Sequence, residues 1–491
     1  MSMAHDTMAH AATWLIAAAA VAGVITRPRH WPEAWWAVLG AAALLLSGLM
    51  SPAAAAAAAG RGADVYLFLI GMMLLAELAR REGLFEWLAT HALLHARGSP
   101  HRLFLLIYAV GTLATIFLSN DATAVVLTPA VYAAARQARL PALPFLLICA
   151  FIANAASFVL PISNPANLVV YAGDMPPLGR WLAAFGAASA VSIVATYLLL
   201  RLTQRRALAV ALTVATATAT NAAAPGATAV TAAATNAIIT TATGAAAVVP
   251  VVAAIATTAA TATTATVVAA PASVLVPVPP LPAAGRIAAA AIALTAVVLL
   301  SASALGWQLG LPTCVAGLAA WLAISLLTRA SPWPVLRGIS WSVLPLVAGL
   351  FVLVEAVQDT GAFTPLLRLA AQAASAAQSV HLPAAALVAG GAAGLGSNVI
   401  NNLPMGLIAA TVAHGVHLPA ALRGALLIGV DLGPNLSVTG SLATILWLLA
   451  IRREGAHVSA WQFLAVGAVV MPLALLATLA AYVANGMFLS H

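Results

Sequence analysis

Charged residues are scarce in this sequence. Of 491 residues, only 7% are Asp, Glu, Lys or Arg, whereas 63% are hydrophobic. A soluble globular domain usually carries about 25% charged residues. The supply of polar side chains is too small to cover a water-facing surface, which excludes a soluble protein. Most of the chain must face the lipid bilayer or other apolar helices, so the composition predicts a polytopic membrane protein.

Lysine is absent, and all 20 basic residues are arginines. They gather in short segments between apolar runs, for example Arg80 with Arg81 and Arg452 with Arg453. Short arginine-rich loops are typical of membrane proteins that follow the positive-inside rule. The net charge of +8 therefore reflects membrane topology, and no nucleic-acid partner is expected.

Cysteine is also scarce, since the chain has only Cys149 and Cys314, which lie far apart in apolar stretches. Such a pair has no metal-ligand spacing, and buried free thiols pack as small hydrophobic side chains. The 11 histidines show no ligand spacing either, and the sequence contains no HExxH motif. We therefore expect no metal site, no cofactor and no enzymatic activity.

Long apolar runs are abundant. Crossing the hydrocarbon core takes roughly 20 apolar residues in a helix, and the chain offers about 10 to 13 such spans or half-spans. Examples are residues 11–24, 103–118 and 463–483. These runs predict an all-α, multi-pass protein of the cell inner membrane.

The second half of the chain repeats the first. Residues 68–88 align with residues 346–366, so that Gly71 matches Gly349 at a step of 278 residues (349 minus 71). Weak internal repeats with interrupted hydrophobic segments are typical of secondary transporters. We predict a first transmembrane repeat, a low-complexity connection and a second transmembrane repeat, at residues 1–206, 207–285 and 286–491.

Four segments interrupt the apolar runs with Asn, Gly, Pro and Ser, which compete with or break helical hydrogen bonding. Irregular backbone at membrane depth is tolerated only where protein buries it or where it lines a watery cavity. Two breaks per half, at matching positions, predict broken helices and re-entrant hairpins that converge on one cavity. The four segments are residues 118–129, 161–171, 394–404 and 431–447.

Amide and hydroxyl side chains in these breaks can both donate and accept hydrogen bonds. We expect them to bind the transported solute, although Asn and Ser also serve as caps and interhelical contacts in membrane helices. The predicted substrate-binding residues are Asn120, Thr123, Ser163, Asn164, Asn167, Asn398, Asn401, Asn402, Thr439, Gly440, Ser441 and Thr444.

Two carboxylates, Asp121 and Asp431, also lie in the breaks. A charged residue at the centre of a membrane helix costs roughly 2.5–3.5 kcal/mol on insertion scales, so such residues are functional by default. We predict that both take part in proton coupling. Two structural alternatives stay open: Asp121 could cap a half-helix that begins near Ala122, and Asp431 could pair with Arg423.

The segment VDLGPNLSVTGSLATILWL at 430–448 closely resembles the signature of the arsenite efflux pump membrane proteins, a family of the ion transporter superfamily. LSNDATAVVLTPAV at 118–131 and ISNPANLVVY at 162–171 resemble motifs of the family's first half, and NNLPMG at 401–406 resembles its second-half hairpin. The resemblance covers both halves and leaves out residues 207–285. It implies two inverted repeats and export of arsenite or antimonite in exchange for protons. A cytoplasmic arsenite-stimulated ATPase is the protein partner that it suggests.

The chemistry of arsenite agrees with the residues in the breaks. At neutral pH arsenite is an uncharged trihydroxide, which needs hydrogen-bond partners rather than countercharges. The alternatives on the same scaffold are a sodium/proton antiporter and a sodium-coupled carboxylate transporter. A carboxylate carrier would place arginine within the breaks, and none lies there. If the halves are inverted, the breaks at 120–123 and 398–402 should enter from opposite membrane faces and meet near the midplane.

Overall fold

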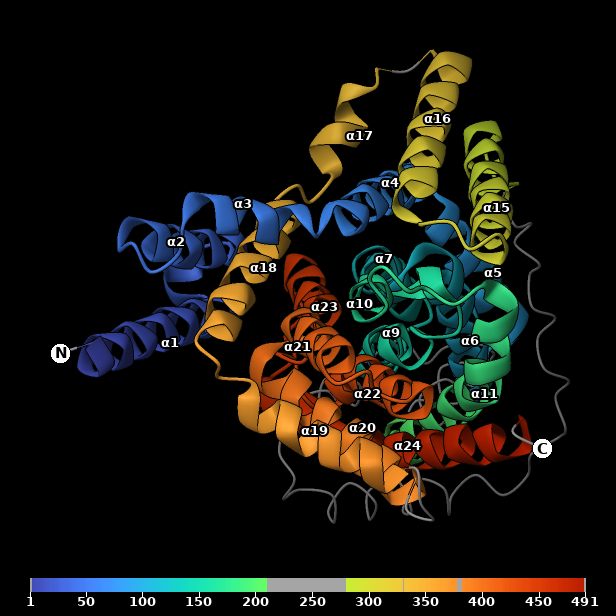
Figure 1. Ribbon diagram of the computed structural model, residues 1–491. Helices are drawn as coiled ribbons and strands as arrows, with labels where there is room; N and C mark the ends of the chain where they lie inside the picture. Colours follow the sequence, from blue (N-terminus) through green and yellow to red (C-terminus); the bar gives the residue numbers. More distant parts are fainter. Residues whose placement is uncertain (1, 210–279, 330, 378–381, 490–491) are drawn as a thin grey trace, which may run out of the picture.

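The computed structural model describes residues 2–209, 280–329, 331–377 and 382–489 (Figure 1). Every regular element among these residues is a helix, which confirms the predicted all-α class. Most of the predicted connection at 207–285 lies outside the described residues.

The first half contains α1 (Ser2–Thr26), η1 (Pro28–His30), α2 (Glu33–Leu46), α3 (Pro52–Gly60), α4 (Ala63–Arg81), α5 (Leu84–Ala96), α6 (Pro100–Leu118), α7 (Asn120–Ala122), η2 (Thr123–Leu127), α8 (Thr128–Gln137), α9 (Leu143–Ala155), η3 (Pro161–Ser163), α10 (Pro165–Val170) and α11 (Leu178–Thr203). The second half contains α15 (Ala283–Ala304), α16 (Gly310–Thr328), α17 (Trp333–Gly338), α18 (Val343–Asp359), α19 (Thr364–Ala377), α20 (Leu382–Ile400), α21 (Asn402–Gly415), α22 (Ala420–Leu432), η4 (Gly433–Leu436), α23 (Leu442–Arg453) and α24 (Ala460–Leu489).

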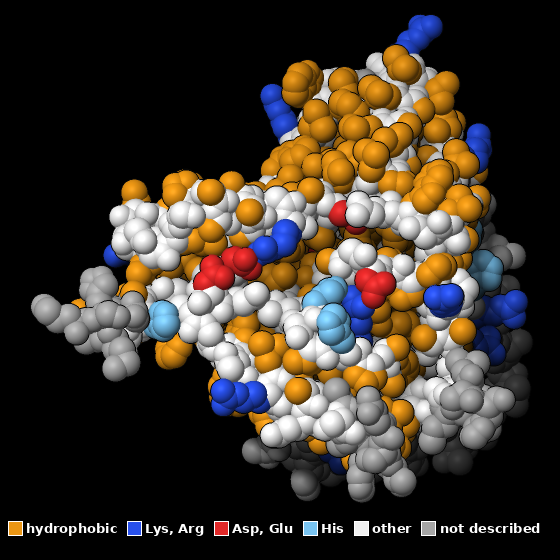
Figure 2. Space-filling model, viewed as in Figure 1, with side chains coloured by type: hydrophobic (Ala, Val, Ile, Leu, Met, Phe, Trp, Pro, Cys, Tyr) orange, Lys and Arg blue, Asp and Glu red, His pale blue; other side chains and the backbone are white. Residues whose placement is uncertain are grey.

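Several helices are long and apolar enough to cross a membrane. The described residues contain seven of them, or up to nine if each of two bent helix pairs forms one span. The remaining apolar runs form the shorter helices α2 and α9 or the fragments at the breaks. Figure 2 shows hydrophobic side chains covering the projection that α15 and α16 form, and Leu326 of α16 is 76% exposed. This surface is suited to lipid, which confirms a multi-pass membrane protein.

The order of helices is the same in the two halves. In each half a long helix carrying the matched glycine is followed by a bend, a helix that stops at a break, and a second broken region. This correspondence is what a duplicated unit produces, whereas the inverted orientation of the halves stays a prediction. The corresponding helices are α1 and α15, α2 and α16, α3 and α17, α4 and α18, α5 and α19, α6 and α20, α9 and α22, α10 and α23, and α11 and α24.

Helices of each half pack against helices of the other half. α4 packs along α16, and their counterparts α18 and α2 pack together in the same way. A Cβ on Gly71 of α4 would lie 2.2 Å from the backbone carbonyl oxygen of Thr313 on α16. A Cβ on Gly349 of α18 would lie 2.8 Å from the backbone carbonyl carbon of Ala37 on α2. The matched glycines therefore allow two equivalent close contacts, and the halves interlock.

The helix break in the second half lies one turn later than the repeat step predicts. Ser119 and Asn401 precede α7 and α21 with nearly the same backbone conformation, φ 87° and ψ 160° against φ 78° and ψ 155°. The step of 278 residues would place this break close to Asn398, which instead remains inside α20. Pro404 sets the latest point at which α20 can end, because a proline ring clashes with the carbonyl group four residues earlier. That residue is Ile400, where α20 ends.

Candidate functional site

The four breaks pack against one another. Segments α7 and η2 of the first break contact α23 of the fourth, and α10 of the second break contacts α21 of the third. Segment η4 of the fourth break contacts α20 and α9. The residues predicted to bind substrate and to couple protons therefore lie on segments that touch one another across the two halves.

The carboxylate of Asp431 lies in a hydrogen-bond network that joins the halves. Its side chain is fully buried on α22. One oxygen accepts a 2.8 Å hydrogen bond from Oγ of Ser157, and the other accepts a 2.8 Å hydrogen bond from Nδ2 of Asn164. The alternative ion pair with Arg423 is wrong, because that guanidinium pairs with Asp174 at 2.7 Å. Among the described residues, the partners of Asp431 are thus neutral donors.

The sequence analysis missed a pair of buried amides beside this network. Nδ2 of Asn154 donates to Oδ1 of Asn435 at 3.0 Å, and Nδ2 of Asn435 donates to the carbonyl oxygen of Phe151 at 3.0 Å. A usable signal was present, because Ser157 and Asn435 are separated by the repeat step of 278 residues (435 minus 157). Extending that step through every polar residue would have identified Ser157 and Asn435, although not Asn154, which the step matches with Leu432.

Asn398 ties the third break to the fourth. Its Nδ2 donates to the carbonyl oxygens of Gly394 and Gly433 at 2.8 and 2.9 Å. Its Oδ1 accepts from the backbone N–H and the hydroxyl of Ser437 at 3.0 and 2.7 Å. The hydroxyl of Thr439 donates to the carbonyl oxygen of Asn398 at 3.2 Å, and Nδ2 of Asn401 donates to the carbonyl oxygen of Thr439 at 3.2 Å. These side chains satisfy the backbone groups that the breaks leave unpaired.

Other predicted substrate-binding residues cap helices. The backbone N–H of Thr444 donates to Oγ of Ser441 at 3.1 Å, while the N–H of Ser441 donates to Oγ1 of Thr444 at 3.2 Å, a capping box. Oδ1 of Asn164 accepts from the N–H of Ala166 at 3.0 Å. The side chains of Ser441, Thr444 and Asn164 therefore act as helix caps, the alternative role expected for Asn and Ser in membrane helices. Asn164 also donates to Asp431.

The remaining predicted residues differ in how many hydrogen bonds their side chains make within the protein. The hydroxyl of Ser163 donates to the carbonyl oxygen of Ile116 at 3.0 Å. A Cβ on Gly440 would lie 2.7 Å from Oδ1 of Asn398, so a glycine is needed for this approach. Oδ1 of Asn167 and Oδ1 of Asn402 are buried without a hydrogen-bond partner among the described residues. Neither residue lines the cavity beside Asp121.

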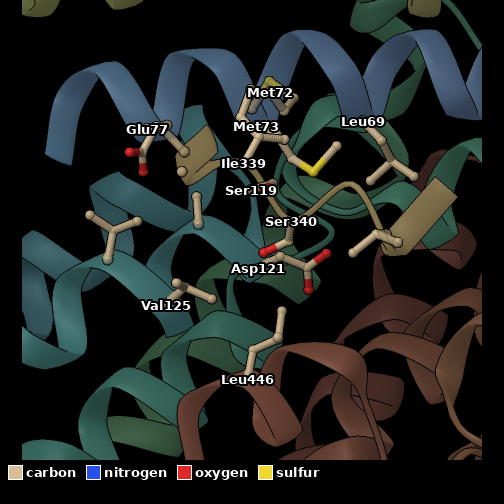
Figure 3. A pocket seen from close by; sticks show the side chains of 15 residues that line it. Leu69, Met72, Met73, Glu77, Ser119, Asp121, Val125, Ile339, Ser340 and Leu446 are labelled. Atoms are coloured by element: carbon tan, nitrogen blue, oxygen red, sulfur yellow. The ribbon is translucent and has the colours of Figure 1, made fainter. Parts of the chain in front are cut away.

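Asp121 lies apart from the Asp431 network and faces a cavity of about 80 Å³ (Figure 3). It is not the cap of α7, since it lies within that helix and Ser119 precedes it. Oδ1 of Asn120 accepts from the N–H of Asp121 at 2.9 Å. The hydroxyl of Thr123 donates to the carbonyl oxygen of Ser119 at 3.2 Å. Side chains of the first break thus form hydrogen bonds with the backbone of the same break, and the Asp121 carboxylate faces the cavity.

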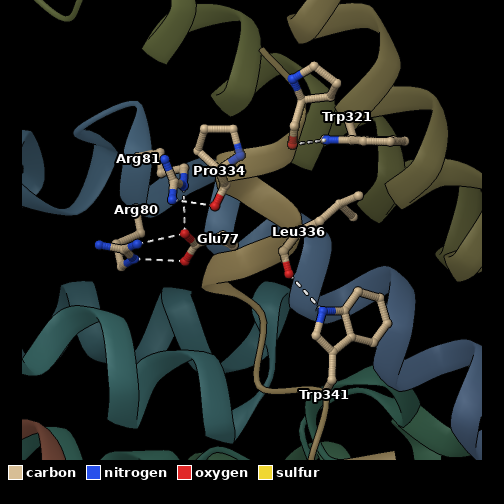
Figure 4. Close-up of polar contacts among 8 residues, drawn as sticks. Glu77, Arg80, Arg81, Trp321, Pro334, Leu336 and Trp341 are labelled. Carbon is tan, nitrogen blue, oxygen red and sulfur yellow. Dashed lines mark hydrogen bonds and ion pairs between the residues drawn. The ribbon is translucent and has the colours of Figure 1, made fainter. Parts of the chain in front are cut away.

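A cluster of charges borders the same cavity (Figure 4). Oε1 of Glu77 on α4 lies 2.6 Å from Nη2 of Arg80 and 2.7 Å from Nε of Arg81. Arg81 also donates to the carbonyl oxygen of Pro334 on α17. A Cβ on Gly338 would lie 1.9 Å from Oε1 of Glu77, so α17 approaches this carboxylate without a side chain between them. The cluster fastens α4 to α17.

Comparison with known proteins places this arrangement in a family. The family model described as citrate transporter matches residues 20–451. The chain belongs to the citrate transporter family. It is therefore a secondary transporter of the membrane and not an enzyme, as the sequence predicted.

Two known proteins and one solved structure are similar to this member of the citrate transporter family. An uncharacterized transporter of Mycobacterium tuberculosis (strain ATCC 25618 / H37Rv) is 26% identical over 83% of this chain and 82% of its own length. The arsenical pump membrane protein of Escherichia coli (strain K12) is 24% identical over 93% of this chain and 95% of its own length. The crystal structure of the YdaH transporter of Alcanivorax borkumensis matches 89% of this chain and 87% of that one, with 17% identity and a TM-score of 0.47.

Proposed function

We propose that this transporter exports arsenite or antimonite in exchange for protons by alternating access. Relatives named arsenical pump membrane proteins support this, because their alignment extends over nearly the whole of both chains. The motifs at 118–131 and 430–448, which resemble that family, lie on breaks that pack against each other.

The main support for the proposal is that the break segments contain neutral polar side chains and two acids but no basic residue. Their substrate-binding candidates are neutral amides and hydroxyls, with Gly440, and their ionisable residues are the acids Asp121 and Asp431. No arginine lies within the four breaks, and the nearby buried Arg423 is already paired with Asp174. An uncharged trihydroxide can be bound by such groups through hydrogen bonds alone. A carboxylate substrate would instead meet two acids and no countercharge.

The proposed proton-coupling groups are placed so that a proton can change the contact between the halves. Asp431 belongs to the second half, and its donors Ser157 and Asn164 belong to the first. A protonated carboxyl group has one oxygen that donates rather than accepts. The Ser157 hydroxyl also lies 2.7 Å from the carbonyl oxygen of Asn154. A protonated Asp431 can therefore donate to Ser157, which then donates to Asn154, and deprotonation reverses the direction of the bond between Ser157 and Asp431. Alternating access needs such a link between proton binding and the packing of the halves.

Sodium-coupled transport of a carboxylate such as citrate is the second candidate, favoured by the description of the matching family model. On this proposal a cation bound near Asp121 or Asp431 would have to supply the charge that the protein lacks. The candidates differ in the driving ion and in the charge of the substrate, so one flux experiment separates them.

Everted membrane vesicles containing the protein provide the test. We expect arsenite to accumulate when the vesicle lumen is acidic, and no sodium requirement. Citrate and labelled sodium are measured in parallel on the same vesicles. Sodium-dependent citrate flux without arsenite uptake would overturn the proposal in favour of the second candidate. Addition of an arsenite-stimulated ATPase and ATP tests the proposed protein partner, because uptake should then proceed without a pH gradient.

A further inference from the structure

The cavity beside Asp121 has the size and the lining of a binding site for a small solute. It lies between α4, the first break, the segment after α17, and Leu446 of α23 (Figure 3). Its volume is about 80 Å³, whereas a single water molecule needs only about 10–15 Å³ of such space. The cavity therefore accommodates a molecule of a few heavy atoms.

Three polar side chains at this cavity are not used by the protein itself. Ser119, Asp121 and Ser340 line it, and their side chains make no hydrogen bond to any other described residue. Ser119 is buried, Asp121 is partly buried and Ser340 is exposed. The contrast with Asp431 is clear, because both oxygens of that carboxylate accept hydrogen bonds from protein side chains. Hydroxyl and carboxylate oxygens that make no bond within the protein can accept or donate hydrogen bonds to a molecule in the cavity. The hydroxyl groups of a small solute would supply the missing partners.

The opposite wall of the cavity carries sulfur. Met72 and Met73 of α4 line it, and Figure 3 shows the thioether of Met73 projecting from α4 on the side of Ser119 and Asp121. The repeat step places Leu350 and Phe351 at the matching positions of α18. Packing of this helix in the related half is thus achieved without sulfur. Thioethers are soft, polarizable ligands, and they adapt to small changes of shape.

Among the described residues, those that line the cavity offer no free positive charge. Glu77 lines it, but the Glu77 carboxylate is held by Arg80 and Arg81 at 2.6 and 2.7 Å. Neither arginine lines the cavity. An anionic substrate would meet the carboxylate of Asp121 without compensation. The oxygens of Asp121, Ser119 and Ser340 could coordinate a hard cation, but the thioethers of Met72 and Met73 would not stabilise it.

We propose that this cavity is where the transported metalloid binds. An uncharged hydroxide with a soft central atom places its hydroxyl groups on Asp121, Ser119 and Ser340, and its centre against Met72 and Met73. This inference rests on the proposed function and names the site within it. The amide-rich breaks around Asp431 then serve chiefly to hold the broken helices and to link the halves.

The test uses the uptake assay with the double variant Met72→Leu plus Met73→Leu, which keeps volume nearly constant. We expect KM for arsenite to rise about threefold to tenfold, corresponding to roughly 0.7–1.4 kcal/mol. The maximal rate and its dependence on pH should be unchanged. The matched control is Met471→Leu, since Met471 is buried on α24 away from the cavity. Ser340→Ala should raise KM similarly, through loss of one hydrogen bond.

The outcomes separate this site from the function as a whole. If the wild-type vesicles accumulate no arsenite, the proposed function fails. If they do, and both the methionine variant and Ser340→Ala keep the wild-type KM, the site is wrong. A sodium flux impaired by Ser340→Ala but not by the methionine variant would overturn it in favour of a hard cation. Should the double variant fail to insert, the single variant Met73→Leu, whose side chain is only partly buried, carries the same test.

Discussion

The hydroxyl of Ser157 donates a 2.8 Å hydrogen bond to the carboxylate of Asp431, and the two residues belong to different halves of the chain. Asn164 donates to the other carboxylate oxygen from the same half as Ser157. Asp431, which is fully buried in the second half, is therefore hydrogen-bonded to residues at the second broken region of the first half. The proposed proton coupling depends on this contact, because it joins Asp431 to residues of the other half.

Neutralising the acids should abolish coupling and preserve folding. Asp431→Asn and Asp121→Asn keep the size of the side chain and remove the group that carries the proton. We expect both variants to reach the membrane at wild-type amounts and to lose arsenite uptake driven by a pH gradient. Asp174→Asn serves as control, since Asp174 is 77% exposed in its ion pair with Arg423. Full pH-driven uptake by both core variants would show that neither residue carries the proton.

Removal of the Ser157 hydroxyl should impair transport without preventing insertion. A hydrogen bond to a charged group contributes about 1.5–3 kcal/mol, and 1.4 kcal/mol corresponds to about tenfold in rate. We expect Ser157→Ala to lower the rate of coupled uptake by up to roughly tenfold, the effect of losing about 1.4 kcal/mol in the rate-limiting step. Ser192→Ala is the matched control, because the buried Ser192 hydroxyl donates to the carbonyl oxygen of Ala155 at 2.8 Å. The Ser157 hydroxyl likewise lies 2.7 Å from the carbonyl oxygen of Asn154, so the variants differ in the contact with the Asp431 carboxylate. Equal rates in the two variants would contradict a role for the Ser157 bond in coupling.

The repeated helices and the positions of the breaks could be predicted from the sequence, because both depend on local composition. Apolar runs of sufficient length must form helices in lipid, and Pro, Gly and Asn mark where they stop. The two core acids were also identifiable, since a carboxylate is rare in so apolar a chain. Their residue type and their position in a break were enough.

The partners of those residues could not be predicted. Asp431 bonds to residues 267 and 274 positions away, and no local pattern encodes such distances. Asn398 was predicted to bind substrate, yet all its polar groups are used to hold the third break against the fourth. The alignment of halves by a constant step also missed the one-turn shift of the third break. Sequence reasoning identified the polar segments, but tertiary packing decides which of their atoms are free.

The close contact at Gly71 should be intolerant of any side chain. A Cβ there would lie 2.2 Å from the backbone oxygen of Thr313, and a backbone atom cannot turn aside as a side chain can. We expect Gly71→Ala to destabilise the folded protein by about 1–3 kcal/mol, the usual cost of overpacking. The melting temperature in detergent is the measurement. Gly186→Ala on α11 should leave it unchanged or raised, because nothing lies within 4 Å of a Cβ at that position.

The thiols should prove dispensable for transport. Cys149 is fully buried on α9 and Cys314 nearly so on α16, and neither lines the cavity beside Asp121. Tight capture of arsenic(III) takes several thiolates together, and two separated thiols cannot provide them. Replacing both by Ala should leave KM for arsenite within about twofold of wild type, since small buried substitutions act on stability rather than on binding. The wild-type protein and the Met72→Leu plus Met73→Leu variant are assayed alongside. Loss of arsenite uptake in a correctly inserted double-alanine variant would mean that thiols coordinate the metalloid, and the oxygen-and-thioether site would then be wrong.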